Sequence, residues 1–155
     1  MTEMIRLYFL YAVIAVFLVI AAVWDIKGGT IPGHLFPCLF GLFVPLVILS
    51  DGFYWLSSVI GLLIGMLCFY IMARFFDGGG GDILMMSVLG WCLGARRLVY
   101  IILLASGVYL LFSLGVMVVY LIQKKKVREA LTNQYPYAPF VLIGYVICYF
   151  AGWLV

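Results

Sequence analysis

The sequence predicts an all-α, polytopic membrane protein with six transmembrane helices. Of the 155 residues, 68% are hydrophobic and only 10% are charged, whereas a soluble domain carries about 25% charged residues. The chain also divides into six apolar segments separated by short polar or charged loops, and roughly 20 apolar residues suffice for a helix to cross a bilayer. This composition excludes both a soluble globular domain and a disordered chain.

The first apolar segment covers about residues 7–24 and ends at Asp25. It is longer than the hydrophobic part of a signal peptide and has no Ala-x-Ala cleavage site, so we interpret it as a retained helix. The other segments cover about residues 35–49, 53–73, 83–93, 98–122 and 139 to the C-terminus. The fourth would span less than about 20 Å of a hydrocarbon core of about 30 Å. Such a short segment is tolerated where it is buried in protein or lines a wet cavity.

No fixed-period repeat and no long linker divide the chain, so we expect a single integral-membrane domain over residues 1–155. Its orientation follows from the basic residues of the short loops. Loops one, three and five carry Lys27, Arg74, Lys124, Lys125, Lys126 and Arg128, and the opposite side carries Arg6, Arg96 and Arg97. This asymmetry predicts that loops one, three and five face the cytoplasm and that both termini lie outside.

The basic cluster at residues 124–128 is typical of an anchor beside anionic lipid headgroups. Binding of nucleic acid would need a folded basic face, which this sequence cannot form. The four cysteines lie in or beside apolar segments without a CxxC pair: Cys38, Cys68, Cys92 and Cys148. They are therefore interpreted as packing residues, and no metal site is expected.

Carboxylates are few, and at membrane depth they are costly enough to suggest a function. Asp25 ends the first segment and Asp82 begins the fourth, and the predicted topology puts both on the cytoplasmic side. Two carboxylates held together can share one proton, so that one acts as a base toward water and the other as an acid toward a carbonyl. The alternative is that each aspartate only caps a helix end, and position alone leaves both interpretations open.

Four glycines, residues 78–81, separate Asp77 from Asp82. Glycine permits unusual backbone dihedrals and lets a peptide approach closely, although a flexible turn is the simpler interpretation. A phosphate-binding loop is poorly supported, because Asp82 rather than lysine follows the last glycine and would repel a phosphate.

These residues carry a resemblance to a known family. Gly79-Gly80-Gly81-Asp82 resembles the GxGD motif of intramembrane aspartyl proteases, and residues 78–94 resemble the corresponding stretch of the type IV prepilin peptidases, which include the preflagellin peptidases. In that family, the first catalytic aspartate is followed by a basic stretch and Ile-Pro, as Asp25 is here by Ile31-Pro32. The late Pro136-Tyr137-Ala138-Pro139 segment is also similar. GxGD alone is weakly specific, but this combination extends over nearly the whole chain.

The resemblance implies an aspartyl endopeptidase that cleaves the short basic leader of a prepilin-like protein, such as a type IV pilin, pseudopilin or flagellin-like protein. Cleavage would occur at the cytoplasmic face of the cell membrane, without metal or other cofactor. The resemblance implies that Asp25 and Asp82 are catalytic and that a second group positions substrate or loops: Gly79, Gly80, Gly81, Ile31 and Pro32.

The chain lacks the cysteine-bearing insertion of the longer members and so resembles the short, peptidase-only members, without a methyltransferase domain. It departs from the family pattern at Gly33, usually Asn, and at Leu84, often Lys. Both departures bear on activity and substrate preference. The competing hypothesis is a non-enzymatic transporter or pilus-assembly scaffold that uses the two aspartates for ion coupling. Inverted repeats between the two halves would indicate a transporter, and we find none.

Overall fold

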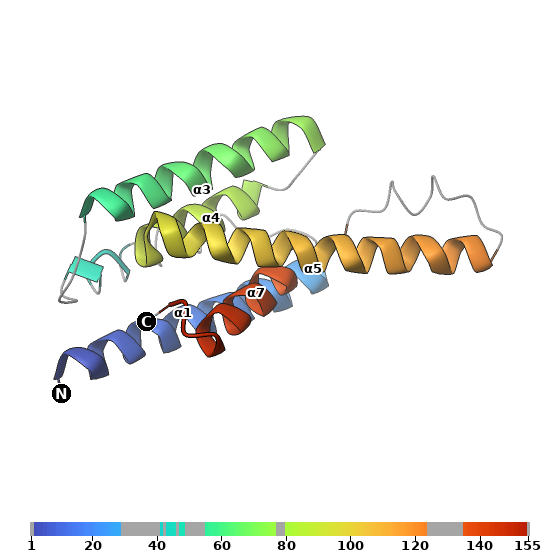
Figure 1. Cartoon of the computed structure of the whole chain (residues 1–155). Coiled ribbons are helices and arrows are strands. Elements are labelled where there is room, and N and C mark those ends of the chain that lie inside the picture. Colours follow the sequence, from blue (N-terminus) through green and yellow to red (C-terminus); the bar gives the residue numbers. More distant parts are fainter. Residues whose placement is uncertain are drawn as a thin grey trace.

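The computed structural model of the protein describes residues 2–28, 41, 43–45, 47–48, 55–76, 80–123 and 135–154. Five helices have defined bounds: α1 (Thr2–Gly28), α3 (Trp55–Phe76), α4 (Gly80–Leu93), α5 (Ala95–Ile122) and α7 (Ala138–Phe150) (Figure 1). The described residues between 41 and 48 are also helical, and no strand occurs in the described part of the chain. The all-α prediction is therefore confirmed.

Three helices are long and apolar enough to cross a membrane: Leu7–Gly28, Trp55–Arg74 and Ala95–Ile122. They coincide with the first, third and fifth predicted segments. Helices α4 and α7 have 14 and 13 residues, which corresponds to about 20 Å each. Most of the second predicted segment lies outside the described residues, so the count of six crossings stays a prediction.

Helix α7 runs in the opposite direction to both α1 and α5. Helix α7 is antiparallel to α1. Ala138 at the start of α7 contacts Asp25 near the end of α1, and the hydroxyl of Tyr145, later in α7, donates to the carbonyl oxygen of Tyr11, earlier in α1. It is also antiparallel to α5, because Tyr137 contacts Ser106 and Gly144 lies beside Ile101. The end of α1 and the start of α7 therefore meet at one end of the bundle, which we call the site end.

Helix α5 is longer than its neighbours. Ser106, which lies level with Tyr137 at the site end, is only the twelfth residue of this 28-residue helix. Figure 1 shows α5 continuing well past the ends of α1, α4 and α7. The site end is therefore level with the middle of α5 rather than with its C-terminus.

Glycines fix the pairing of α3 with α4. A Cβ atom on Gly90 would lie 2.1 Å from the carbonyl oxygen of Gly61, and one on Gly65 would lie 2.3 Å from the carbonyl oxygen of Met86. Only glycine permits the two backbones to approach so closely. This close approach holds the start of α4, with Asp82, near the end of α3.

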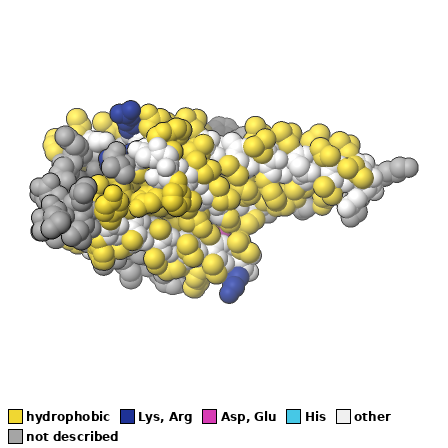
Figure 2. Space-filling view, turned by 60° about the horizontal axis from the view of Figure 1, so that its bottom comes forward, with side chains coloured by type: hydrophobic (Ala, Val, Ile, Leu, Met, Phe, Trp, Pro, Cys, Tyr) yellow, Lys and Arg dark blue, Asp and Glu magenta, His cyan; other side chains and the backbone are white. Residues whose placement is uncertain are grey.

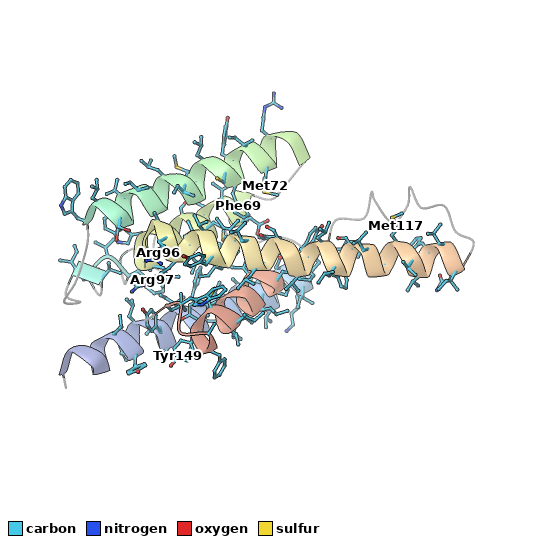
Figure 3. The ribbon with its side chains drawn as sticks, in the orientation of Figure 1. Phe69, Met72, Arg96, Arg97, Met117 and Tyr149 are labelled. Atoms are coloured by element: carbon cyan, nitrogen blue, oxygen red, sulfur yellow. The ribbon has the colours of Figure 1, made fainter. Side chains whose placement is uncertain are left out.

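The connection from α4 to α5 is a single residue, Gly94, whose φ of 79° lies in the left-handed region that favours glycine. Arg96 and Arg97, which were expected in a loop, therefore belong to the first turn of α5. They lie at the opposite end of the bundle from Asp25 and Asp82 (Figure 3).

Apolar side chains fill the interior and also cover the outside. The fully buried side chains include Ile14, Leu18, Met85, Leu89 and Ile101. Figure 2 shows hydrophobic side chains over most of the visible surface, with few Lys or Arg side chains. Since a water-exposed protein rarely has so large an apolar surface, this surface is adapted to lipid, and the chain is a membrane protein.

Candidate functional site

Asp25 lies in the last turn of α1 but points into the bundle, where only 7% of the residue is exposed. Its Oδ2 atom accepts a hydrogen bond of 2.9 Å from the backbone N–H of Ala138. The N–H groups in the first turn of a helix have no acceptor within that helix, and Tyr137, which precedes α7, provides no side-chain cap. Asp25 therefore caps α7 from another helix, and the α7 N-terminus also favours a negative charge there.

Asp82 lies in the first turn of α4, half-buried and outside the three helices long enough to span the membrane. Burial, and secondly the charge of Asp25, raise the pKa of Asp82 to about 6. The structure thus brings the two aspartates within electrostatic reach of each other at the site end. Because a nearby like charge disfavours ionisation, Asp82 keeps its proton to a higher pH than a free carboxyl group does.

Tyr137 is the third polar group at the site. Its hydroxyl lies 3.2 Å from Ser106 Oγ, and its ring packs against Phe69, with centroids 5.5 Å apart, and against Tyr109, at 5.8 Å. Figure 3 shows Phe69 on the side of α3 that faces α5. Burial chiefly raises the pKa of Tyr137, the hydrogen bond with Ser106 opposes this, and the charge of Asp82 raises it further. Tyr137 therefore lies near Asp82 and next to Ala138, whose backbone N–H donates to Asp25.

The sequence did not assign a catalytic or positioning role to Tyr137, Ala138 or Ser106. One signal was present, because the Pro136–Pro139 segment precedes the last helix and Pro139 has no N–H of its own. Pro139 in the first turn marks the helix start and so marks Ala138 N–H as a donor without a helical acceptor. The identity of the acceptor depends on how α1 and α7 pack.

The glycine run differs from the expectation. Gly80 and Gly81 belong to the first turn of α4, so at least these two glycines are helical rather than part of a loop. A Cβ on Gly80 would meet no heavy atom within 4 Å, which leaves space beside the start of α4. The other predicted positioning residues, Gly79, Ile31 and Pro32, lie outside the described residues.

Among the described residues, the site brings together the carboxyl groups of Asp25 and Asp82 and the phenol of Tyr137. Within the described residues, no group of three or more His, Cys, Asp or Glu side chains is arranged as a metal site. The described groups can transfer protons and form hydrogen bonds with a polar substrate. Leu84, one of the two departures from the family pattern, is 42% exposed on α4.

Fold and site together define a small polytopic membrane protein with an interacting pair of aspartates at one end of a helical bundle. Residues 12–114 match the type IV leader peptidase family. This range is more than half of the chain and includes both aspartates. The chain therefore belongs to the type IV leader peptidase family, as its motifs suggested, and is a peptidase with a protein substrate. No curated protein and no solved structure matches it.

Proposed function

We propose that this protein is an aspartyl endopeptidase that removes the leader peptide of prepilin-like proteins, with Asp25 and Asp82 as its catalytic pair. The observation that carries the proposal is the asymmetric environment of the two carboxylates. Asp25 accepts a hydrogen bond from the N-terminus of α7, while Asp82 lies half-buried near the charge of Asp25. This asymmetry is the property that acid–base catalysis by two carboxylates requires.

The asymmetry assigns a role to each aspartate. The Ala138 N–H stabilises negative charge on Asp25, so Asp25 is the base that takes a proton from the attacking water. Asp82 carries the shared proton and donates it to the carbonyl oxygen of the scissile bond, which gives a tetrahedral gem-diol. The leaving amine then takes the proton held by Asp25 as the C–N bond breaks, and Asp82 recovers its proton when the carbonyl re-forms.

The charges at the two ends of the bundle support a site that faces the cytoplasm. Lys27 lies in the last turn of α1 and Arg74 in the last turn of α3, at the site end. Arg96 and Arg97 lie at the other end, where Lys and Arg are fewer in the sequence. The positive-inside rule places the more basic end in the cytoplasm, where the basic leader of a substrate would also lie.

The proposal is tested by coexpression with a prepilin-like protein that has a short basic leader followed by an apolar helix. We expect a gel shift that corresponds to leader removal, with the new N-terminus identified by mass spectrometry. Asp77→Ala is the matched control for Asp82→Ala, because the two aspartates flank the same glycines and Asp77 lies outside the GxGD pattern. Asp77→Ala should retain cleavage and Asp82→Ala should lose it.

The transporter hypothesis predicts a different result in the same system. Purified protein in vesicles would carry ions or protons in a manner that depends on Asp25 and Asp82, and no leader would be cleaved. That pair of results would overturn the peptidase mechanism proposed for these aspartates.

A further inference from the structure

The short segment that precedes α7 is held from two sides. On one side, Ala138 N–H donates to Asp25 on α1. On the other, the hydroxyl of Tyr137 lies 3.2 Å from Ser106 Oγ, at the middle of α5. The two contacts arise from adjacent residues, so a single peptide unit connects the catalytic helix α1 to α5.

The hydrogen bond between Ser106 and Tyr137 lies at the exposed surface of the bundle. Ser106 lies on a helix whose neighbouring turns are apolar, and a hydroxyl in such surroundings gains from an internal partner because lipid offers none. Packing against Phe69 and Tyr109 would hold a phenylalanine ring in the same place. Packing therefore fixes the position of the ring, whereas the hydroxyl adds a directional hydrogen bond that fixes the orientation of residue 137.

The orientation of residue 137 decides where the next N–H points. Tyr137 has φ −91° and ψ −30°, and a change in ψ would rotate the peptide unit that carries Ala138 N–H. Because hydrogen bonds weaken steeply as they bend, a small rotation would loosen the contact with Asp25 Oδ2. The phenol of Tyr137 would also move relative to Asp82, whose charge raises the pKa of that phenol.

We propose that the Ser106–Tyr137 pair is a positioning device that holds the N–H of Ala138 on Asp25 and so keeps Asp25 in the orientation of a general base. The inference rests on the proposed function. Tyr137 and Ser106 act through Ala138 and Asp25, and neither needs to touch the scissile bond. Catalytic geometry is sensitive to such support, since misplacement by about 1 Å can lower a rate by about 100-fold.

The test compares Ser106→Ala, Tyr137→Phe and the double variant in leader cleavage by purified protein. We expect each single variant to lower kcat by about 10-fold or more with KM nearly unchanged, because ground-state binding does not depend on the base. The double variant should lose no more than either single variant, since both remove the same bond. Ser106→Thr, which keeps the hydroxyl, should restore most of kcat.

Two matched controls make the same chemical changes nearby. Tyr109→Phe removes the hydroxyl of the ring that packs on Tyr137, and Ser113→Ala removes a hydroxyl two turns further along α5. Both should leave kcat unchanged. A loss of kcat in the controls equal to that in Tyr137→Phe, additive losses in the double variant, or an effect on KM alone would overturn the inference.

A second measurement does not depend on cleavage. Amide hydrogen exchange at Ala138 should be about 10-fold faster in Ser106→Ala and Tyr137→Phe than in the unaltered protein, because a loosened hydrogen bond opens more often. Unchanged exchange would overturn the inference even if kcat falls. If the unaltered protein cleaves no leader, the proposed function fails. The exchange rates still decide whether the Ser106–Tyr137 pair holds the Ala138 N–H on Asp25.

Discussion

Replacement of Asp82 by asparagine should make the protein more stable at neutral pH. The pKa of Asp82 is raised from its ordinary value of 3.8 to about 6 by burial and by Asp25. A raised pKa in the folded state means that protonation favours folding. The stabilisation is fully present below about pH 4 and is lost as the pH rises through about 6. At neutral pH the ionised side chain therefore opposes folding, and asparagine removes that charge.

The size of the effect follows from the pKa difference. Each unit corresponds to about 1.4 kcal/mol, so a shift of about two units sets an upper bound of about 3 kcal/mol. Because Asp82 is only half-buried, solvent screening lowers the expected gain to about 1–2 kcal/mol. The variant should gain this stability at pH 7–8 relative to the unaltered protein and gain little at pH 4–5.

The assay is unfolding in detergent micelles, followed by tryptophan fluorescence at a series of pH values. Asp25→Ala is the comparison, and the expected sign is opposite. It removes the acceptor of Ala138 N–H, and the loss of such a cap costs about 1 kcal/mol. Two results would refute the conclusion that the pKa of Asp82 is raised in the folded protein. One is a stability difference for Asp82→Asn that does not grow with pH, and the other is a variant less stable than the unaltered protein at pH 7.

Three further predictions address packing, topology and catalysis. Gly90→Ala should destabilise the protein by about 2 kcal/mol or more in unfolding assays, because its Cβ would lie 2.1 Å from the Gly61 carbonyl oxygen. Gly107→Ala is the control: its Cβ would meet no heavy atom within 4 Å, so it should be neutral or slightly stabilising. In a background without native cysteines, Lys126→Cys should react with a membrane-impermeant reagent only from the cytoplasmic side and Asp51→Cys only from outside; the reverse labelling would contradict a cytoplasmic site. The rate of leader cleavage should fall as the pH rises through about 6, because Asp82 then loses the proton it must donate; a rate that rises over this range would contradict its role as the acid.

Much of the architecture follows from the sequence because lipid restricts what the backbone can do. Long apolar segments must form helices in a membrane, and α1, α3 and α5 lie where those segments predict. Gly80 and Gly81 were harder to place, because glycine alone disfavours a helix. They nevertheless form the first turn of α4.

The site was predicted less completely than the fold. The sequence placed Asp25 and Asp82 on one side of the membrane, but it could not show that Asp25 caps α7. That contact joins residues 113 positions apart and depends on the depth at which α1 and α7 pack. The same holds for Tyr137 and Ser106, which meet only because α5 passes the site end at its middle.

The central claim is that Asp25 and Asp82 act together as one catalytic pair. The most direct test is leader cleavage by Asp25→Asn and Asp82→Asn, purified and shown by fluorescence to be folded, with a prepilin-like protein that the unaltered protein cleaves. A pair that shares one proton needs both carboxyls, so each variant should lose cleavage entirely. Full cleavage by either folded variant would contradict the account.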